Sequence, residues 1–195
     1  MKLIIITAAM LMAGSAVTPP PASTLPNALG AVQESRTPDV IYVPTPPEVV
    51  EAMLDMAQVK DGDVLYDLGS GDGRIPIAAA KRAKITATGI DIDPQRIAEA
   101  NANAKAAGVA DRVTFKRADL FASDFSDASV VTLYLLDTLN EKLRPKLLAE
   151  LKPGTRIVSH AFRMGDWEPE KTEEINGRTI YFWTVPAKGA TPKGL

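Results

Sequence analysis

The sequence predicts an α/β fold: a Rossmann-like, doubly wound sheet covered by helices. Short apolar segments alternate with longer helical ones between residues 45 and 162, as in successive parallel βαβ units. The first of the strand-like segments runs directly into a glycine-rich turn. After residue 170 the alternation ends in two β-rich segments joined by Asn176-Gly177, a pair that favours a tight antiparallel hairpin.

The individual elements follow from apolar periodicity and from signals at their ends. Helices are expected over residues 46–57, 75–83, 94–107 and 140–151, and strands over 64–68, 85–92, 113–115, 130–136, 156–162, 171–175 and 179–185. Thr45, with Glu48 three residues later, has the pattern of a capping box at the start of the first helix. Thr138 and Glu141 have the same pattern before the last helix.

The composition excludes several classes of enzyme. The chain has 195 residues, 22 basic and 24 acidic side chains, one histidine and no cysteine. Without cysteine it can form no disulfide, thiolate zinc site or cysteine nucleophile, and one histidine cannot build a multi-histidine metal site. We therefore expect no metal. A formal charge of −2 gives no support for a broad basic surface, so we expect no nucleic-acid partner.

The first forty residues differ in composition from the rest. Lys2 and an apolar run over residues 3–17 with small residues near its end predict a secretory signal peptide over residues 1–16. An uncleaved membrane anchor and a buried helix are the alternatives. Eight of the fifteen prolines fall within residues 18–47, which predicts a linker over 17–40. We expect the folded domain over 41–186, a flexible tail over 187–195, and an exported, periplasmic or membrane-anchored protein.

The most informative motif is Asp67-Leu-Gly-Ser-Gly-Asp-Gly-Arg74, which follows the first predicted strand. A buried strand, a glycine turn and a helix are the setting of a nucleotide-binding loop, although a plain strand–helix connection is the alternative. Asp91 lies 24 residues after Asp67, at the end of the next strand. There a carboxylate can accept hydrogen bonds from both hydroxyls of a ribose.

Charge and glycine spacing distinguish between nucleotides. The glycines are spaced Gly-x-Gly-x-Gly instead of the Gly-x-Gly-x-x-Gly of dinucleotide sites, and no Gly-Lys-Ser/Thr of a P-loop follows. Asp67 and Asp72 would repel a pyrophosphate, but they tolerate a ligand that carries an ammonium and a sulfonium. Electrostatics therefore favours S-adenosylmethionine over NAD.

These motifs together resemble a known family. Residues 67–74, Gly89-Ile-Asp91 and Ala118-Asp119 resemble successive motifs of class I S-adenosylmethionine-dependent methyltransferases, over about residues 42–185. That family has a seven-stranded sheet whose last strand is antiparallel, which the predicted hairpin would supply. Four further segments are similar to small bacterial relatives of the mitochondrial lysine methyltransferases that act on the ATP synthase c subunit and the adenine nucleotide translocase: Tyr42–Thr45, Leu133–Leu136, Leu143–Leu147 and Val158–Phe162.

The resemblance implies a set of cofactor-binding residues that follow the first three strands: Asp67, Gly69, Ser70, Gly71, Gly73, Asp91, Ile92 and Asp119. The glycine loop would face the methionine end of the cofactor and Asp91 the ribose. Ile92 would pack against the adenine, and Asp119 would accept a hydrogen bond from its exocyclic amine. As alternatives, Ile92 could be an ordinary core residue and Asp119 a helix cap.

Candidate catalytic groups lie where the strands end. Asp137 could orient or deprotonate an acceptor, or it could simply begin a helix. Thr45, from the motif before the first helix, would close the pocket. His160 fits a buried core histidine better than a base facing the pocket, and Trp167 could line an acceptor groove or cover the sheet. No Asn/Asp-Pro-Pro-Tyr signature follows the fourth strand, which argues against the usual nucleic-acid base N-methyltransferases.

The expected activity is transfer of a methyl group from S-adenosylmethionine to a protein lysine, on a membrane protein if the narrower resemblance holds. The alternatives are methylation of a small molecule or lipid, and a domain that binds the cofactor without catalysis. An exported location conflicts with a cofactor made in the cytoplasm. The sequence leaves the oligomeric state open.

Overall fold

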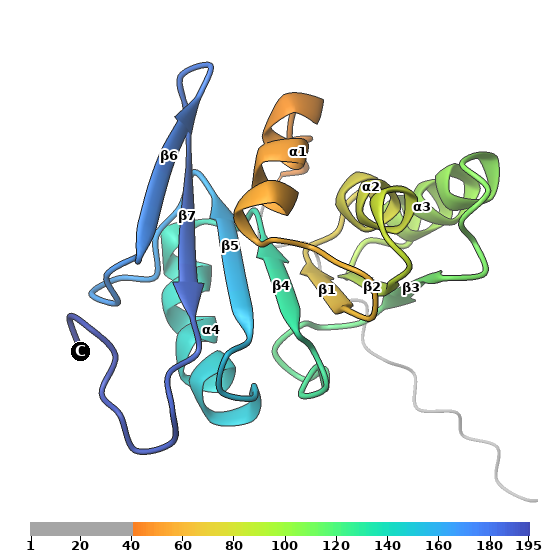
Figure 1. The fold of residues 1–195 in the computed structure, drawn as a ribbon. Helices are drawn as coiled ribbons and strands as arrows, with labels where there is room; N and C mark the ends of the chain where they lie inside the picture. Colours follow the sequence, from red (N-terminus) through yellow and green to blue (C-terminus); the bar gives the residue numbers. More distant parts are fainter. Residues whose placement is uncertain (1–40) are drawn as a thin grey trace, which may run out of the picture. The chain divides into compact units, whose positions relative to one another are not determined.

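A single seven-stranded sheet forms the centre of the computed structural model, which describes residues 41–195 (Figure 1). Its strands are β1 (Val64–Leu68), β2 (Thr86–Asp91), β3 (Val113–Arg117), β4 (Val130–Leu133), β5 (Arg156–His160), β6 (Lys171–Ile175) and β7 (Arg178–Thr184). They lie in the order β3-β2-β1-β4-β5-β7-β6. The first five are parallel, and β7 is antiparallel to both β5 and β6. The predicted fold class and antiparallel end are thus confirmed.

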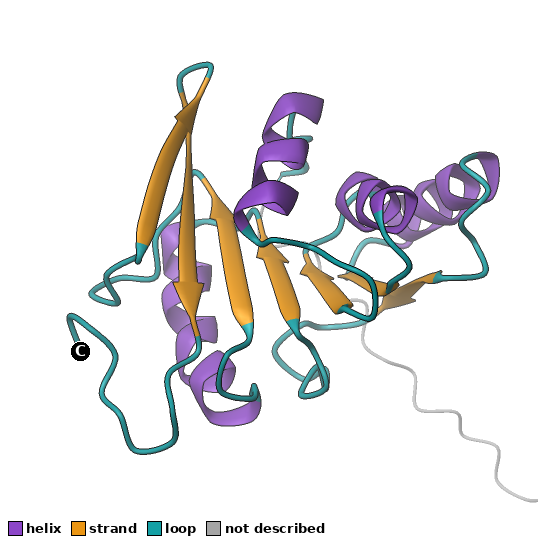
Figure 2. Cartoon of the chain, viewed as in Figure 1, coloured by secondary structure: helices purple, strands orange, loops and turns teal. Residues whose placement is uncertain are grey.

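Helices cover both faces of the sheet (Figure 2). The four helices of the described chain are α1 (Pro47–Met56), α2 (Arg74–Arg82), α3 (Pro94–Ala106) and α4 (Asp137–Glu150). The helices α1, α2 and α3 bury their apolar sides in one core cluster, while α4 contributes to a second cluster on the other face. The order of strands reverses between β1 and β4, which is where ligands bind in open α/β sheets.

Alternation along the central strands decides which side chains face which layer. In β4 and β5, Val130 and Val158 belong to the core under α1, whereas Val131 and Ile157 belong to the core under α4. Because side chains of a strand alternate between faces, the next even-numbered positions also point toward the α1 layer. His160, the last residue of β5, is one of these positions.

The hairpin prediction is confirmed in detail. Asn176 and Gly177 connect β6 to β7 and have φ values of 50° and 75°. A primed two-residue turn requires positive φ at both positions, and asparagine and glycine adopt that conformation most easily.

Neither of the two capping boxes predicted from the sequence forms in the structure. Pro46 occupies the N-cap of α1 and no side chain caps that helix. The hydroxyl of Thr45 lies instead 3.2 Å from Nδ1 of His160. The last helix begins at Asp137, three residues earlier than expected, so Thr138 lies inside its first turn. Proline at the helix start already sets the helical φ angle, which leaves the threonine hydroxyl available to a buried partner.

The structure describes the C-terminal end of the chain and not the N-terminal end. The predicted signal peptide (residues 1–16) and linker (17–40) lie outside the described residues and stay predictions. At the other end, the backbone N–H of Glu168 donates to the carbonyl of Lys193 at 2.9 Å, and the two side chains form an ion pair at 2.6 Å. Within residues 41–195, no helix is long and apolar enough to cross a membrane.

Candidate active site

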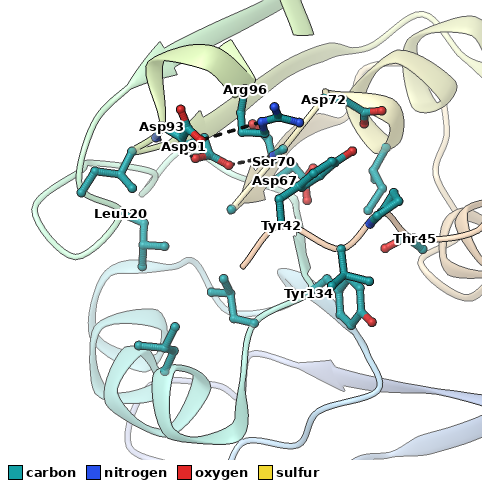
Figure 3. Close-up of a pocket in the computed structure, with 18 of the residues that line it drawn as sticks. Tyr42, Thr45, Asp67, Ser70, Asp72, Asp91, Asp93, Arg96, Leu120 and Tyr134 are labelled. Atoms are coloured by element: carbon teal, nitrogen blue, oxygen red, sulfur yellow. Dashed lines mark hydrogen bonds and ion pairs between the residues drawn. The ribbon is translucent and has the colours of Figure 1, made fainter. Parts of the chain in front are cut away.

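A cavity of about 520 Å³ opens beyond the carboxyl ends of the central strands (Figure 3). The loops that follow β1, β2, β3 and β4 line it, and residues 41–45 close one side. In Figure 3, Asp91 and Leu120 lie at one end of the cavity, Thr45 and Tyr134 lie at the other, and Asp67 and Ser70 lie between them.

Two glycines of the first loop are required by its geometry. Gly69 has a φ of 85°, and an added Cβ would lie 2.7 Å from the side chain of Leu135. Gly71 has a φ of 52°, and an added Cβ would lie 2.3 Å from the ring of Tyr42. Only a residue without a side chain allows this turn and these contacts together.

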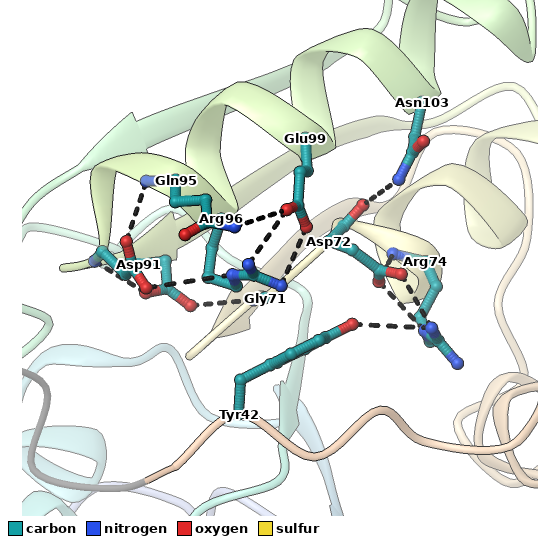
Figure 4. Close-up of polar contacts among 10 residues, drawn as sticks. Tyr42, Gly71, Asp72, Arg74, Asp91, Gln95, Arg96, Glu99 and Asn103 are labelled. Carbon is teal, nitrogen blue, oxygen red and sulfur yellow. Dashed lines mark hydrogen bonds and ion pairs between the residues drawn. The ribbon is translucent and has the colours of Figure 1, made fainter.

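Backbone donors hold the carboxylate of Asp91 in the cavity (Figure 4). Its Oδ2 accepts a hydrogen bond from the N–H of Gly71 at 2.8 Å, and its Oδ1 accepts one from the N–H of Asp93 at 2.9 Å. Each oxygen of a carboxylate has more than one acceptor position. The group is therefore fixed in place and can still accept hydrogen bonds from a ligand.

Asp67 is a buried acid at the centre of the cavity. Its side chain is almost fully buried, and its Oδ1 accepts a hydrogen bond from the hydroxyl of Thr132 at 2.7 Å. Burial, opposed by the hydrogen bond from Thr132 and helped by the nearby carboxylates of Asp91 and Asp72, raises the pKa of Asp67 to about 7. A positively charged ligand group beside Asp67 would favour its ionised form.

Replacing Asp67 with asparagine is expected to raise the melting temperature of the ligand-free protein, more at pH 8 than at pH 5. The pKa of Asp67 is higher in the folded chain than its ordinary value of 3.8, so ionisation disfavours the folded state as the pH rises from about 4 to 7. Asparagine keeps an acceptor for Thr132 and carries no charge. Thermal unfolding at the two pH values, with the exposed Asp111→Asn as control, measures the difference. An equal change at both pH values would contradict the raised pKa.

Two arginines contact the segment of residues 41–45 and hold it over the glycine loop (Figure 4). Arg74 donates to the carboxylate of Asp72 through Nε at 2.9 Å and Nη2 at 2.7 Å, and to the carbonyl of Thr45 through Nη1 at 2.7 Å. The guanidinium of Arg96 lies over the ring of Tyr42, 4.6 Å from its centroid. These contacts bring Thr45 to the cavity.

His160 lies fully buried behind Thr45, which confirms the interpretation of a core histidine. Burial, helped by the charge of Arg178, lowers the pKa of His160 to about 4, so its ring is neutral near pH 7. Trp167 is also buried, and its carbonyl accepts a hydrogen bond from Nε1 of Trp183 at 2.9 Å. It is a core residue and does not line the cavity.

The structure brings most of the predicted site residues together. Those that line the cavity are Thr45, Asp67, Gly69, Ser70, Gly71, Asp91, Ile92 and Asp119. Gly73 does not line it; it is the N-cap of α2, packed against Phe115. Asp137 is exposed outside the cavity, and its Oδ1 accepts a hydrogen bond from the N–H of Arg163 at 2.8 Å. This favours the helix-start alternative for Asp137.

Asp119 lines the cavity and also shapes its own loop, since its Oδ1 accepts a hydrogen bond from the N–H of Phe121 at 2.9 Å. Sequence reasoning assigned no role to the side chains of Tyr42, Arg74, Arg96 and Tyr134. Tyr42 and Tyr134 do fall within two of the segments that carry the narrower resemblance. No sequence motif indicated a role for the two arginines, because no local sequence pattern predicts that Arg96 contacts Tyr42.

Comparison with known proteins identifies the family. Residues 67–171 match the family model described as the ANTKMT methyltransferase domain. This chain belongs to that methyltransferase family. The methyltransferase is 47% identical to a protein-lysine N-methyltransferase of Saccharolobus islandicus, over 77% of this chain and 97% of that protein. It is 32% identical to the adenine nucleotide translocase lysine N-methyltransferase of Mus musculus, over 78% of this chain and 66% of that longer protein.

The solved structure of a relative identifies the cofactor. The methyltransferase is 55% identical to a protein of Salinibacter ruber described as an RNA methyltransferase, solved with S-adenosylhomocysteine. The two agree with a TM-score of 0.74, over 75% of this chain and 95% of that one. S-adenosylhomocysteine is what remains of S-adenosylmethionine after methyl transfer. The methyltransferase therefore uses S-adenosylmethionine, as predicted.

Proposed function

We propose that this methyltransferase modifies the side-chain amine of lysine in a protein. The observation that carries the proposal is the charge of the cavity. Five acids line it, Asp67, Asp72, Asp91, Asp93 and Asp119, against two arginines. Both arginines are paired with acids: Arg74 with Asp72 at 2.7 Å and Arg96 with Glu99 at 2.8 Å.

A cavity of this charge attracts cationic ligands and repels phosphates. Both a lysine ammonium and the cofactor, with its sulfonium and ammonium groups, are cationic. The names of the relatives from Saccharolobus islandicus and Mus musculus also support a lysine acceptor. A membrane protein as the acceptor is supported by the name of the mouse relative, which specifies a translocase.

The lining residues fit the cofactor. Asp91 would accept hydrogen bonds from the ribose, Ile92 would pack against the adenine, and Asp119 would accept from its exocyclic amine. Asp67 would face the cationic methionine end. Ser70 Oγ is buried and has no hydrogen-bond partner within residues 41–195, so it is available to a polar atom of the ligand. These roles match the charges and positions of the side chains.

The bound cofactor supplies a methyl group on a sulfonium, so that the acceptor nitrogen forms an N–C bond as the C–S bond breaks and its electron pair passes to sulfur. The protein must present a neutral amine in line with that methyl group. Thr45 lines the end of the cavity away from Asp91 and would orient the amine there. The sulfonium and ammonium of the bound cofactor offset the acids of the cavity. The partly apolar lining, with Leu135 and Leu139, then disfavours the charged form of an entering amine and so helps its deprotonation.

RNA is the second candidate acceptor, because the Salinibacter ruber relative is described as an RNA methyltransferase. The acid-rich cavity and the formal charge of −2 disfavour RNA as the acceptor. RNA recognition would need basic or stacking groups outside the cavity to bind the phosphates and unstacked bases.

Radiolabelled methyl transfer distinguishes these candidates. The full chain is incubated with methyl-labelled S-adenosylmethionine and separate protein, RNA, lipid and small-molecule fractions of cells. We expect label in the protein fraction, resistant to ribonuclease, which acid hydrolysis releases as methylated lysine. Label that ribonuclease removes would establish the RNA alternative. Label confined to lipid or small molecules, or cofactor binding without transfer, would also overturn the lysine proposal.

A further inference from the structure

The buried histidine touches two residues that line the acceptor end of the cavity. His160 is fully buried, and its Nδ1 lies 3.2 Å from Oγ1 of Thr45. Its ring packs on that of Tyr134, with centroids 3.9 Å apart and planes at 31°. Thr45 and Tyr134 both line the cavity, whereas His160 does not. The histidine is thus one layer behind the surface that an acceptor would meet.

The fold explains why these three residues meet. The strands β4 and β5 are parallel, with Leu133 paired to Ser159 at the end of β4, so Tyr134, which directly follows β4, comes beside His160, the last residue of β5. The alternation of both strands directs them toward the layer that contains α1. This helix packs on β5 and β7, and the chain that enters it carries Thr45. Thr45 and His160 are 115 residues apart in the sequence.

The hydrogen on the imidazole ring can be assigned from the surroundings. A ring buried this deeply is neutral, so only one of its two nitrogens carries hydrogen. Among the described residues, Nε2 of His160 is buried with no hydrogen-bond partner. A buried N–H without a partner is rarer in native structures than a buried acceptor without one. The hydrogen therefore belongs on Nδ1, which donates to Oγ1 of Thr45 and leaves that oxygen an acceptor position for a ligand.

The backbone after His160 is also unusual. Ala161 has a φ of 64°, a value that non-glycine residues rarely adopt, and the N–H of Phe162 donates to the carbonyl of His160 at 2.8 Å. This tight turn brings the ring of Phe162 against that of Tyr134, with centroids 5.9 Å apart. Uncommon backbone conformations of this kind persist where the surrounding structure holds them, often at functional sites.

From this arrangement we propose that Tyr134 forms the aromatic wall of the acceptor-amine site and that His160 is a positioning residue for Thr45 and Tyr134. Oγ1 of Thr45 accepts an N–H of the amine, and the face of Tyr134 packs against its carbon chain and any positive charge. His160 fixes the threonine by a hydrogen bond and the tyrosine by stacking. This inference rests on the proposed function, because it takes the acceptor to be an amine.

Sinefungin tests the proposal without an acceptor protein. It is an analogue of S-adenosylmethionine in which a carbon bearing an amine replaces the methylated sulfur, whereas S-adenosylhomocysteine has no group at that position. The ratio of their dissociation constants therefore reports contacts to an amine at the position of the transferred methyl group, directly beside the acceptor nitrogen. Calorimetry with the full chain gives both constants for the wild type and for each variant.

Thr45→Val is expected to reduce the preference for sinefungin by about tenfold, the effect of one hydrogen bond to a charged group, while S-adenosylhomocysteine binds as before. His160→Phe is also expected to reduce the preference for sinefungin, although residue 160 lies outside the cavity. Tyr134→Leu also reduces it. Thr45→Ser and Tyr134→Phe are expected to keep the wild-type ratio, because serine retains the hydroxyl and phenylalanine retains the aromatic ring. Thr114→Val, on an exposed strand position, is the control.

An unchanged ratio in Thr45→Val or Tyr134→Leu would overturn the amine site. An unchanged ratio in His160→Phe would overturn the positioning role of His160. If His160→Phe does not fold, His160→Asn takes its place; it keeps an amide N–H for Thr45 but loses the stacking ring, and a wild-type ratio there would contradict the stacking role. Because sinefungin binding needs no acceptor, RNA labelling by the wild type would refute the proposed function and leave these ratios interpretable.

Discussion

Asp91→Ala is expected to weaken the binding of S-adenosylmethionine by about ten- to a hundredfold, which corresponds to the loss of one hydrogen bond to a charged group. The substitution removes the carboxylate that would accept from the ribose. It also deprives the N–H groups of Gly71 and Asp93 of their acceptor, at 2.8 and 2.9 Å in the wild type. Isothermal titration of the full chain with S-adenosylmethionine measures the change.

Two further variants make this result specific. Asp91→Asn keeps one acceptor oxygen and should bind with intermediate affinity. Asp111→Ala removes an exposed acid that pairs only loosely with Arg112, at 3.9 Å, and should bind as the wild type does. Wild-type affinity in Asp91→Ala, with an unchanged melting temperature, would show that the ribose is not held by Asp91.

Arg156→Ala is expected to lower the free energy of unfolding by about 3 kcal/mol, because it leaves a buried carboxylate without its charged partner. Arg156 forms an ion pair with Asp63, whose side chain is 5% exposed. Its Nη1 also donates to the carbonyls of Ala57 and Gln58 at 2.6 and 2.8 Å. One side chain on β5 therefore ties the end of α1 to the start of β1.

Urea denaturation at pH 7 tests this, with Arg82→Ala as the matched control. Arg82 pairs with Glu51 and Asp55, whose side chains are more than 60% exposed. Exposed ion pairs contribute about 0–1 kcal/mol, so the control should lose little stability. The midpoint should shift with an unchanged slope if only stability has changed. An equal loss in both arginine variants would mean that the burial of Asp63 does not matter.

The parts of the fold that were predictable are those with local causes. The alternation of apolar segments predicted the parallel sheet, and Asn176-Gly177 predicted its antiparallel end. The boundaries were less reliable where two local signals competed. Thr138 and Glu141 suggested a helix start that lies three residues too late, because β4 ends at Leu133 and the chain turns into α4 soon after it.

The candidate site also has a part that was predictable from local sequence and a part that was not. Asp67, Gly69, Gly71 and Asp91 stand at the ends of predictable strands, so their gathering follows from the parallel sheet alone. The position of Asp137 was not predictable in this sense. A residue just after β4 could point into the cavity or outward, and only the exact start of α4 turns its carboxylate toward the N–H of Arg163.

The sequence by itself determined the class of fold, the glycine loop, the acid after the second strand and, through charge, a preference for a cationic cofactor. These depend on residue type and on repeats of two or about four residues, which can be read locally. Only the tertiary structure decided that Tyr42 covers Gly71, that five acids share one cavity with two neutralised arginines, and that His160 supports Thr45 and Tyr134. The contacts of Tyr42 with Gly71 and of His160 with Tyr134 and Thr45 join residues from 26 to 115 positions apart, and they depend on how helices and strands pack, which no local pattern encodes.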